Sequence, residues 1–119
     1  MTDNDVEDLI QNYVSDIETI KMLGFDGVEL HGAHGYMIDQ FFWRDTNIRK
    51  DKYGKEEDLR TKFVCEIVSR ARKLVGNDFP IMLRFSQWKQ QDYEALLAPS
   101  PEDLEIFLGP ISDLSLIHI

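Results

Sequence analysis

GFDGVELHGAHGY, residues 24–36, is the stretch that decides the fold, because a short apolar run in it leads to two of the three histidines in the chain. Residues 25–30 predict a short strand, and His31 stands at the C-terminal end of that strand. His34 and Tyr36 follow in the adjoining loop. Functional residues of parallel α/β folds collect where strands end and loops begin, so these three side chains form a candidate site.

Helix and strand patterns alternate on both sides of this stretch. Apolar residues at helical spacing predict a helix over about residues 5–23, which Gly24 ends in the left-handed conformation. A polar loop, residues 45–58, leads to a second helix that Gly76 closes. The apolar side of this second helix consists of Leu59, Phe63, Ile67, Val68, Ala71, Leu74 and Val75.

The second half of the chain repeats the pattern. FPIMLRFS, residues 79–86, predicts another buried strand. Ser100 has the properties of a helix cap, with Pro101 in the first turn and two acidic residues behind it. The order is therefore helix, strand, helix, strand, helix (αβαβα). Helices of this length between short apolar strands favour parallel βα units in one α/β domain.

The composition excludes several classes of protein. The 119 residues are 43% hydrophobic and 11% aromatic, which is enough apolar material for one globular core. With 13 basic and 22 acidic residues the net charge is −9, which argues against a nucleic-acid surface and favours a soluble, cytoplasmic protein. No run approaches the roughly 18 apolar residues of a membrane span. Cys65, the single cysteine, is expected to be a small buried hydrophobe without a chemical role.

Two interpretations stay open for the polar residues of the candidate site. The histidines can be a loop pair whose ring nitrogens are satisfied by backbone carbonyls, or they can be functional. A zinc site is not expected, because HxxH lacks a third ligand at a recognisable spacing. Arg84 in the second strand can neutralise Glu29 on the neighbouring strand, since a charge inside a sheet needs a partner.

Three segments of the chain carry a resemblance to a known family. They are GFDGVELHGAHGYMIDQF at residues 24–41, TNIRKDKYG at 46–54 and DFPIMLRFSQWKQQDY at 78–93. In this order and spacing they resemble the old yellow enzyme family of FMN-dependent oxidoreductases, also described as NADH:flavin oxidoreductases. That family is a (β/α)8 TIM barrel of about 250 residues. Residues 1–113 are therefore expected to be a central fragment, a partial barrel of about two to three βα units, and residues 114–119 a non-family tail that arose as a sequencing artefact.

The resemblance also implies the chemistry of the site. In this family a histidine pair donates hydrogen bonds to the oxygen of a carbonyl conjugated to a C=C bond, and His31 and His34 match that pair. Tyr36 matches the proton donor, and Arg84 matches the arginine at the pyrimidine edge of FMN. The implied reaction is an ene-reduction with NADH or NADPH as reductant, in which hydride passes from reduced FMN to a small-molecule activated alkene.

The sequence departs from the family pattern in two respects. Phe42, Trp43 and Arg44 stand where the family has leucine and small residues, and Trp88 lies near the site, so these side chains either narrow the pocket or cover the barrel rim. Strands at both ends of the barrel are missing, so the fragment alone is expected to be inactive. The alternative is a non-catalytic truncated domain that folds only by association, since open strand edges favour a homo-oligomer.

Overall fold

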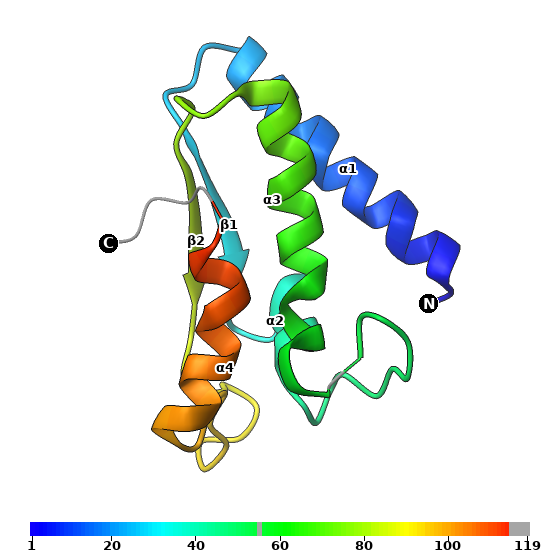
Figure 1. Ribbon diagram of the computed structural model, residues 1–119, viewed down its shortest axis with the longest axis vertical. Coiled ribbons are helices and arrows are strands. Elements are labelled where there is room, and N and C mark those ends of the chain that lie inside the picture. The colour runs from blue at the N-terminus through cyan, green and yellow to red at the C-terminus, as the bar shows by residue number, and fades with distance from the viewer. Residues whose placement is uncertain (55, 115–119) are drawn as a thin grey trace.

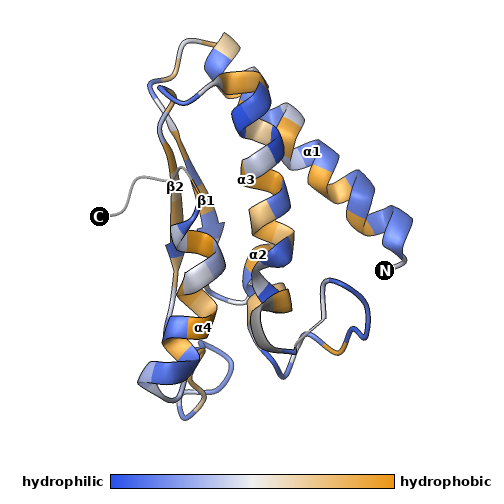
Figure 2. Cartoon of the chain, in the orientation of Figure 1, coloured by the Kyte–Doolittle hydropathy of each residue, from blue (hydrophilic) through white to orange (hydrophobic). Residues whose placement is uncertain are grey.

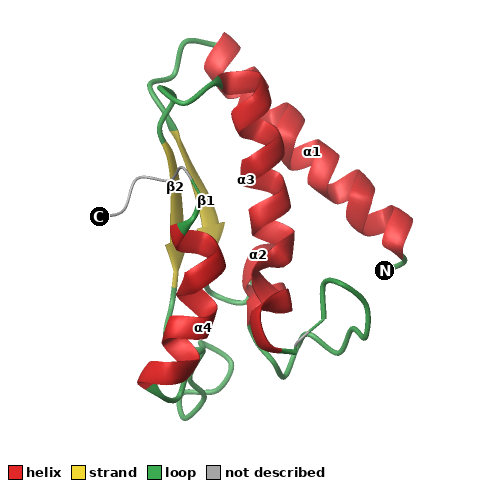
Figure 3. Ribbon diagram, viewed as in Figure 1, coloured by secondary structure: helices red, strands yellow, loops and turns green. Residues whose placement is uncertain are grey.

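A computed structural model describes residues 1–54 and 56–114. Its elements, in chain order, are α1 (Asp3–Met22), β1 (Val28–Gly32), α2 (Met37–Phe42), the 3-10 helix η1 (Glu57–Thr61), α3 (Lys62–Val75), β2 (Ile81–Phe85) and α4 (Pro101–Ser112). The two strands lie side by side, and α1 packs against α3 (Figure 1). The predicted α/β order is present, together with two short helical elements, α2 and η1, that the sequence did not predict (Figure 3).

α1 follows the predicted apolar stripe. A capping box begins the helix: the Thr2 hydroxyl accepts a hydrogen bond from the Asp5 N–H, and the Asp5 carboxylate accepts one from the Thr2 N–H. Gly24, with φ 87°, follows the helix in the predicted left-handed conformation. Hydrophilic and apolar residues alternate around the helix (Figure 2). None of the helices in residues 1–54 and 56–114 has the length and apolar character of a membrane span.

α3 begins at Lys62, later than the predicted residue 59, because η1 occupies the preceding turn. Gly76, with φ 76°, closes the helix as predicted. The prediction that Leu74 lies on the apolar side was wrong, since its side chain is 50% exposed. Val64 is fully buried, because α3 packs against α1 as well as against the sheet.

The two strands pair in parallel, with Val28 opposite Ile81 and His31 opposite Arg84. This confirms the predicted parallel arrangement of the βα units. β1 begins later than the predicted residue 25, because Phe25 is an exposed loop residue. β1 ends at Gly32, so His31 is the next-to-last residue of the strand.

The two faces of this sheet differ in what covers them. On one face Leu30 and Ile81 are buried in a core shared with residues of α1, α3 and α4. On the other face lie Glu29, His31 and Arg84, which are half-buried or exposed. We call the second face the open face. The polar side chains of the candidate site therefore project from the open face.

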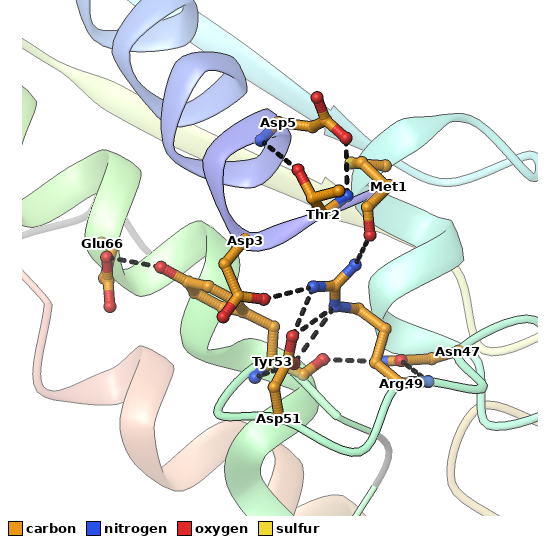
Figure 4. Close-up of polar contacts among 9 residues, drawn as sticks. All are labelled: Met1, Thr2, Asp3, Asp5, Asn47, Arg49, Asp51, Tyr53 and Glu66. Carbon is orange, nitrogen blue, oxygen red and sulfur yellow. Dashed lines mark hydrogen bonds and ion pairs between the residues drawn. The ribbon is translucent and has the colours of Figure 1, made fainter.

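The loop at residues 46–54 is fastened to the start of α1 by Arg49 (Figure 4). Arg49 Nη2 donates to the Asp3 carboxylate at 3.1 Å, and Arg49 Nη1 donates to the Met1 carbonyl at 2.8 Å. The same guanidinium forms an ion pair with Asp51 inside the loop. The hydrogen bonds from Arg49 to the Asp51 carboxylate hold the pKa of Asp51 at about 2, below its ordinary value of 3.8.

Asn47 and Tyr53 fix the interior of the same loop (Figure 4). The buried Asn47 amide donates to the carbonyls of Phe41 and Tyr53, both at 2.8 Å. The Tyr53 hydroxyl donates to the Glu66 carboxylate of α3 at 2.9 Å. The polar residues of this loop therefore serve the fold by joining α1, α2 and α3.

Candidate functional site

The structure brings the three candidate side chains at the end of β1 together. The ring centroids of His31 and His34 are 4.9 Å apart, and those of His31 and Tyr36 are 5.5 Å apart. His34 is exposed and Tyr36 is 63% exposed, so a ligand can reach both rings. Within residues 1–54 and 56–114, neither imidazole has a hydrogen-bond partner, which argues against the pair being satisfied by backbone carbonyls.

A tight turn at residues 33–36 creates this arrangement. The Tyr36 N–H donates to the Ala33 carbonyl at 3.3 Å, and the two central residues have positive φ, 63° at His34 and 77° at Gly35. Two positive φ values are the mark of a type I′ turn. Outside glycine, the left-handed conformation costs about 1 kcal/mol or more per residue. Other contacts must therefore hold His34 in place.

Those contacts come from α2 and from the loop that follows β2. The Asp39 carboxylate accepts from the Gly35 N–H at 2.8 Å and forms an ion pair with Lys89. Both side chains of the pair are almost completely buried, at 1% and 0% exposure. Sequence reasoning missed this pair, although Asp39 is the one charged residue in the run MIDQFF.

Arg84 forms an ion pair with Glu29 on the open face. Its Nε lies 3.0 Å from Glu29 Oε1, and its Nη2 donates to Oε2 at 3.2 Å. The geometry matches the interpretation in which the two charges neutralise each other across the strands. The Arg84 side chain is 60% exposed, and within residues 1–54 and 56–114 its Nη1 has no partner. A role for Arg84 in binding a cofactor stays a prediction.

The bulky residues after α2 take different places. Phe42 is fully buried, with its ring centroid 5.0 Å from that of Phe107, so it belongs to the core between α2 and α4 and does not narrow a pocket. Arg44 forms an ion pair with Asp103 at 3.2 Å. Trp88 is 68% exposed near the end of β2. Of the aromatic residues singled out in the sequence, Trp88 is therefore the most accessible to a ligand.

Arg60 is a buried cation that sequence reasoning also missed. Its Nη1 donates to the carbonyls of Phe42 at 3.3 Å and Leu97 at 2.9 Å, and its guanidinium lies 5.3 Å from the Phe107 ring centroid. Burial lowers the pKa of Arg60. Because this side chain is fully buried, it supports the loops behind the site and does not contact a ligand.

A cavity of about 310 Å³ lies beside the candidate residues, between α1 and β1. Its walls include Tyr13, Ile17, Glu29, His31 and Tyr36. Burial raises the pKa of Tyr13 in this wall. In the part of the chain that the structure describes, no three His, Cys, Asp or Glu side chains are grouped so as to hold a metal ion.

Comparison with known proteins gives a consistent result. Residues 1–98 match the model of the NADH:flavin oxidoreductase / NADH oxidase family. The chain is 48% identical over 86 residues to a NADH oxidase of Thermoanaerobacter brockii, and 40% identical over 87 residues to a cinnamate reductase of Clostridium sporogenes. It superposes on the old yellow enzyme homologue of Zymomonas mobilis with a TM-score of 0.81 and 26% identity. The fold is therefore part of a TIM barrel, as expected.

The matched regions cover most of this chain and a small part of each relative. The two aligned sequences each cover 72% of this chain and 13% of the relative. The superposition covers 98% of this chain and 32% of the Zymomonas mobilis protein. The chain thus spans at most about a third of the length of these three relatives. Of the predicted non-family tail at residues 114–119, residues 115–119 lie outside the described residues.

Proposed function

Because this chain belongs to the NADH:flavin oxidoreductase / NADH oxidase family, we propose that it forms the acceptor-binding part of an FMN-dependent NAD(P)H oxidoreductase. In this proposal His31 and His34 bind the acceptor, and Tyr36 protonates it. The proposal rests on one observation, the convergence of two imidazoles and a phenol at the end of β1 with no hydrogen bond to the imidazoles from the described residues.

The two imidazoles can act as a donor pair for one oxygen atom. Negative charge develops on a conjugated carbonyl oxygen when hydride reaches the far carbon of the alkene. N–H donors placed in advance stabilise that charge more than they stabilise the neutral acceptor, so they lower the barrier. The Tyr36 hydroxyl is an O–H donor, and it can deliver its proton to the other alkene carbon.

Arg84 is the residue we propose for contact with the cofactor. FMN, when bound, would supply the hydride, and NADH or NADPH would return the flavin to its reduced form. The site fits such a group, because Arg84 lies next to His31 on the open face, and its Nη1 has no partner among the described residues while Nε and Nη2 bind Glu29. The Arg84 guanidinium would donate a hydrogen bond from Nη1 to the ring system, while the Glu29 carboxylate balances part of its charge.

We propose a small activated alkene as the acceptor. One relative bears the name cinnamate reductase. Cinnamate carries a C=C bond conjugated to a carboxylate, and a carboxylate or carbonyl oxygen is a suitable acceptor for the paired N–H donors of His31 and His34.

The test is a chimera in which residues 1–113 replace the matching segment of the Zymomonas mobilis relative. In this chimera, His31→Ala combined with His34→Gly removes both imidazoles, and glycine keeps the left-handed turn unstrained. Turnover of a small cyclic enone should fall by about 10² to 10³, the scale for lost oxyanion donors, while flavin reduction by NADPH changes less. Asp45→Ala, an exposed change after α2, is the control. Unchanged enone turnover in the double variant would contradict the proposal.

A second proposal concerns the 119-residue chain alone, namely that it is inactive and associates. It is supported by the open face of the sheet, where Glu29, His31 and Arg84 have no covering element in the described residues. Each of the two strands also has one edge without a partner strand in that part of the chain. Light scattering and flavin absorbance of the purified chain test this. A monodisperse monomer with stoichiometric FMN would contradict it.

A further inference from the structure

We propose that the buried ion pair of Asp39 and Lys89 is the positioning element of the site. Through Gly35 it sets the left-handed turn that brings His34 and Tyr36 to His31. The inference rests on the function proposed above for these three rings, but the geometry of the turn can be measured without that function.

The Asp39–Lys89 pair is buried. Asp39 lies in α2 and Lys89 lies 50 residues further along the chain, and both side chains are almost completely inaccessible. A buried ion pair loses the hydration of both charges, and an apolar pair of similar size is often as stable or more stable. Stability alone therefore does not account for the pair. Because Lys89 is inaccessible, it cannot contact an acceptor either.

The Asp39 carboxylate binds Lys89 and the turn at the same time. One oxygen, Oδ1, binds Lys89, and the other, Oδ2, accepts from the Gly35 N–H at 2.8 Å. Lys89 thus fixes the carboxylate at the distance and orientation that the turn requires. Lys89 Nζ also lies 5.8 Å from the ring centroid of Trp43, just after α2. Lys89 thus joins the loop after β2 to α2 at Asp39 and to the residue that follows α2.

The remaining groups of the turn are held from the same two parts of the chain, α2 and the loop after β2. Gln40 of α2 donates to the Gly35 carbonyl at 2.8 Å, and Gln91 of the loop after β2 donates to the His34 carbonyl at 3.4 Å. A Cβ added at Gly35 would lie 1.9 Å from Gln91 Nε2. The strained φ of His34 is therefore imposed by a frame in which the Asp39–Lys89 pair is the buried part.

Two paired replacements in the full 119-residue chain separate positioning from stability. Asp39→Leu with Lys89→Met removes both charges and also the acceptor for Gly35, and such apolar replacements commonly preserve the melting temperature. Asp39→Asn with Lys89→Met removes the same charges but retains a side-chain oxygen that can accept the Gly35 N–H. Asp45→Asn with Lys50→Met, at two exposed positions, is the matched control.

The measurements are amide hydrogen exchange at Gly35 and the ring contact between His31 and Tyr36 in NMR spectra. The Leu–Met pair should raise exchange at Gly35 at least about tenfold and weaken the ring contact. The Asn–Met pair should stay within about threefold of the unaltered chain. Equal exchange in all variants would overturn the proposal. If the Leu–Met and Asn–Met variants lost protection of the Gly35 amide equally, the acceptor role of Asp39 would be overturned.

The chimeric barrel gives a second measurement that does not depend on the spectra of the isolated chain. There the Leu–Met pair should lower enone turnover about tenfold with little change in flavin reduction, and the Asn–Met pair should restore most of it. Equal turnover for both pairs would overturn the positioning role. Unchanged turnover after removal of the His31 and His34 imidazoles would instead refute the proposed function and leave the exchange result valid.

Discussion

The loop at residues 46–54 and the turn at residues 33–36 both belong to segments that resemble the family, but their polar side chains differ in their hydrogen-bond partners. In the loop, Asn47, Arg49 and Tyr53 use their polar groups on backbone carbonyls and carboxylates of the same chain. In the turn, the rings converge at the surface and the imidazoles have no such partner in the described residues. Used hydrogen-bonding groups thus identify residues that hold the fold, and unused ones identify residues available to a ligand.

Among the changes that test this comparison, Tyr36→Phe has the largest expected effect. If the turn serves chemistry, loss of the Tyr36 hydroxyl should lower enone turnover in the chimera by about 10² to 10⁴, because protonation of carbon is removed. The unfolding free energy should stay nearly constant, since Tyr36 is 63% exposed. Quinone reduction, which needs no carbon protonation, is the internal control. An equal loss with quinones would argue against a proton donor.

Asn47→Ala tests the opposite side of the comparison. It leaves the buried carbonyls of Phe41 and Tyr53 without their donors, so the unfolding free energy should fall by about 2 to 3 kcal/mol in urea denaturation. Asn12→Ala, at an exposed position of α1, is the control and should change it by less than about 0.5 kcal/mol. A similar small change for both would mean that the loop is not held by Asn47.

Asp51 sharpens the comparison through pH. Its pKa is about 2 in the folded chain against an ordinary 3.8, so its contribution to stability is fully present above pH 3.8 and is lost as the pH falls through about 2. Asp51→Asn should therefore lower the unfolding free energy by about 1 to 2 kcal/mol at pH 7 and by much less at pH 2. Urea titrations at both pH values measure this, with Asp45→Asn as control. A difference independent of pH would exclude the Arg49 ion pair as its source.

Tyr53→Phe has the smallest expected effect and mirrors the change at Tyr36. It removes the hydrogen bond from the Tyr53 hydroxyl to Glu66 and should lower the unfolding free energy by about 1 kcal/mol. Enone turnover in the chimera should not change. If Tyr53→Phe lowered turnover and Tyr36→Phe lowered stability, the distinction between the two regions would be reversed.

Local signals in the sequence were enough to predict the long elements. α1 and α3 follow from apolar periodicity and from Gly24 and Gly76, and α4 follows from its cap, since the Ser100 hydroxyl accepts from the Asp103 N–H at 3.1 Å. α2 was missed because it has only six residues and its cap position, Tyr36, makes no side-chain capping bond. Apolar periodicity can be recognised only in a helix longer than this one.

The candidate site was predicted in its exposed part and missed in its buried part. His31, His34 and Tyr36 are close in sequence, so strand alternation and the motif were enough to group them. Asp39 and Lys89 are 50 residues apart, and their contact depends on the packing of α2 against the loop after β2. Neither composition nor spacing carries that information.

The left-handed backbone of His34, with φ 63°, also limits what directed evolution can find at this position. Valine, isoleucine and other β-branched residues are strongly disfavoured at such φ values, whereas glycine, asparagine and aspartate tolerate them. Of those three, asparagine alone offers a neutral side-chain N–H donor. If His34 is the donor proposed above, a saturation library at residue 34 of the chimera should retain asparagine among its active members and lose the β-branched residues.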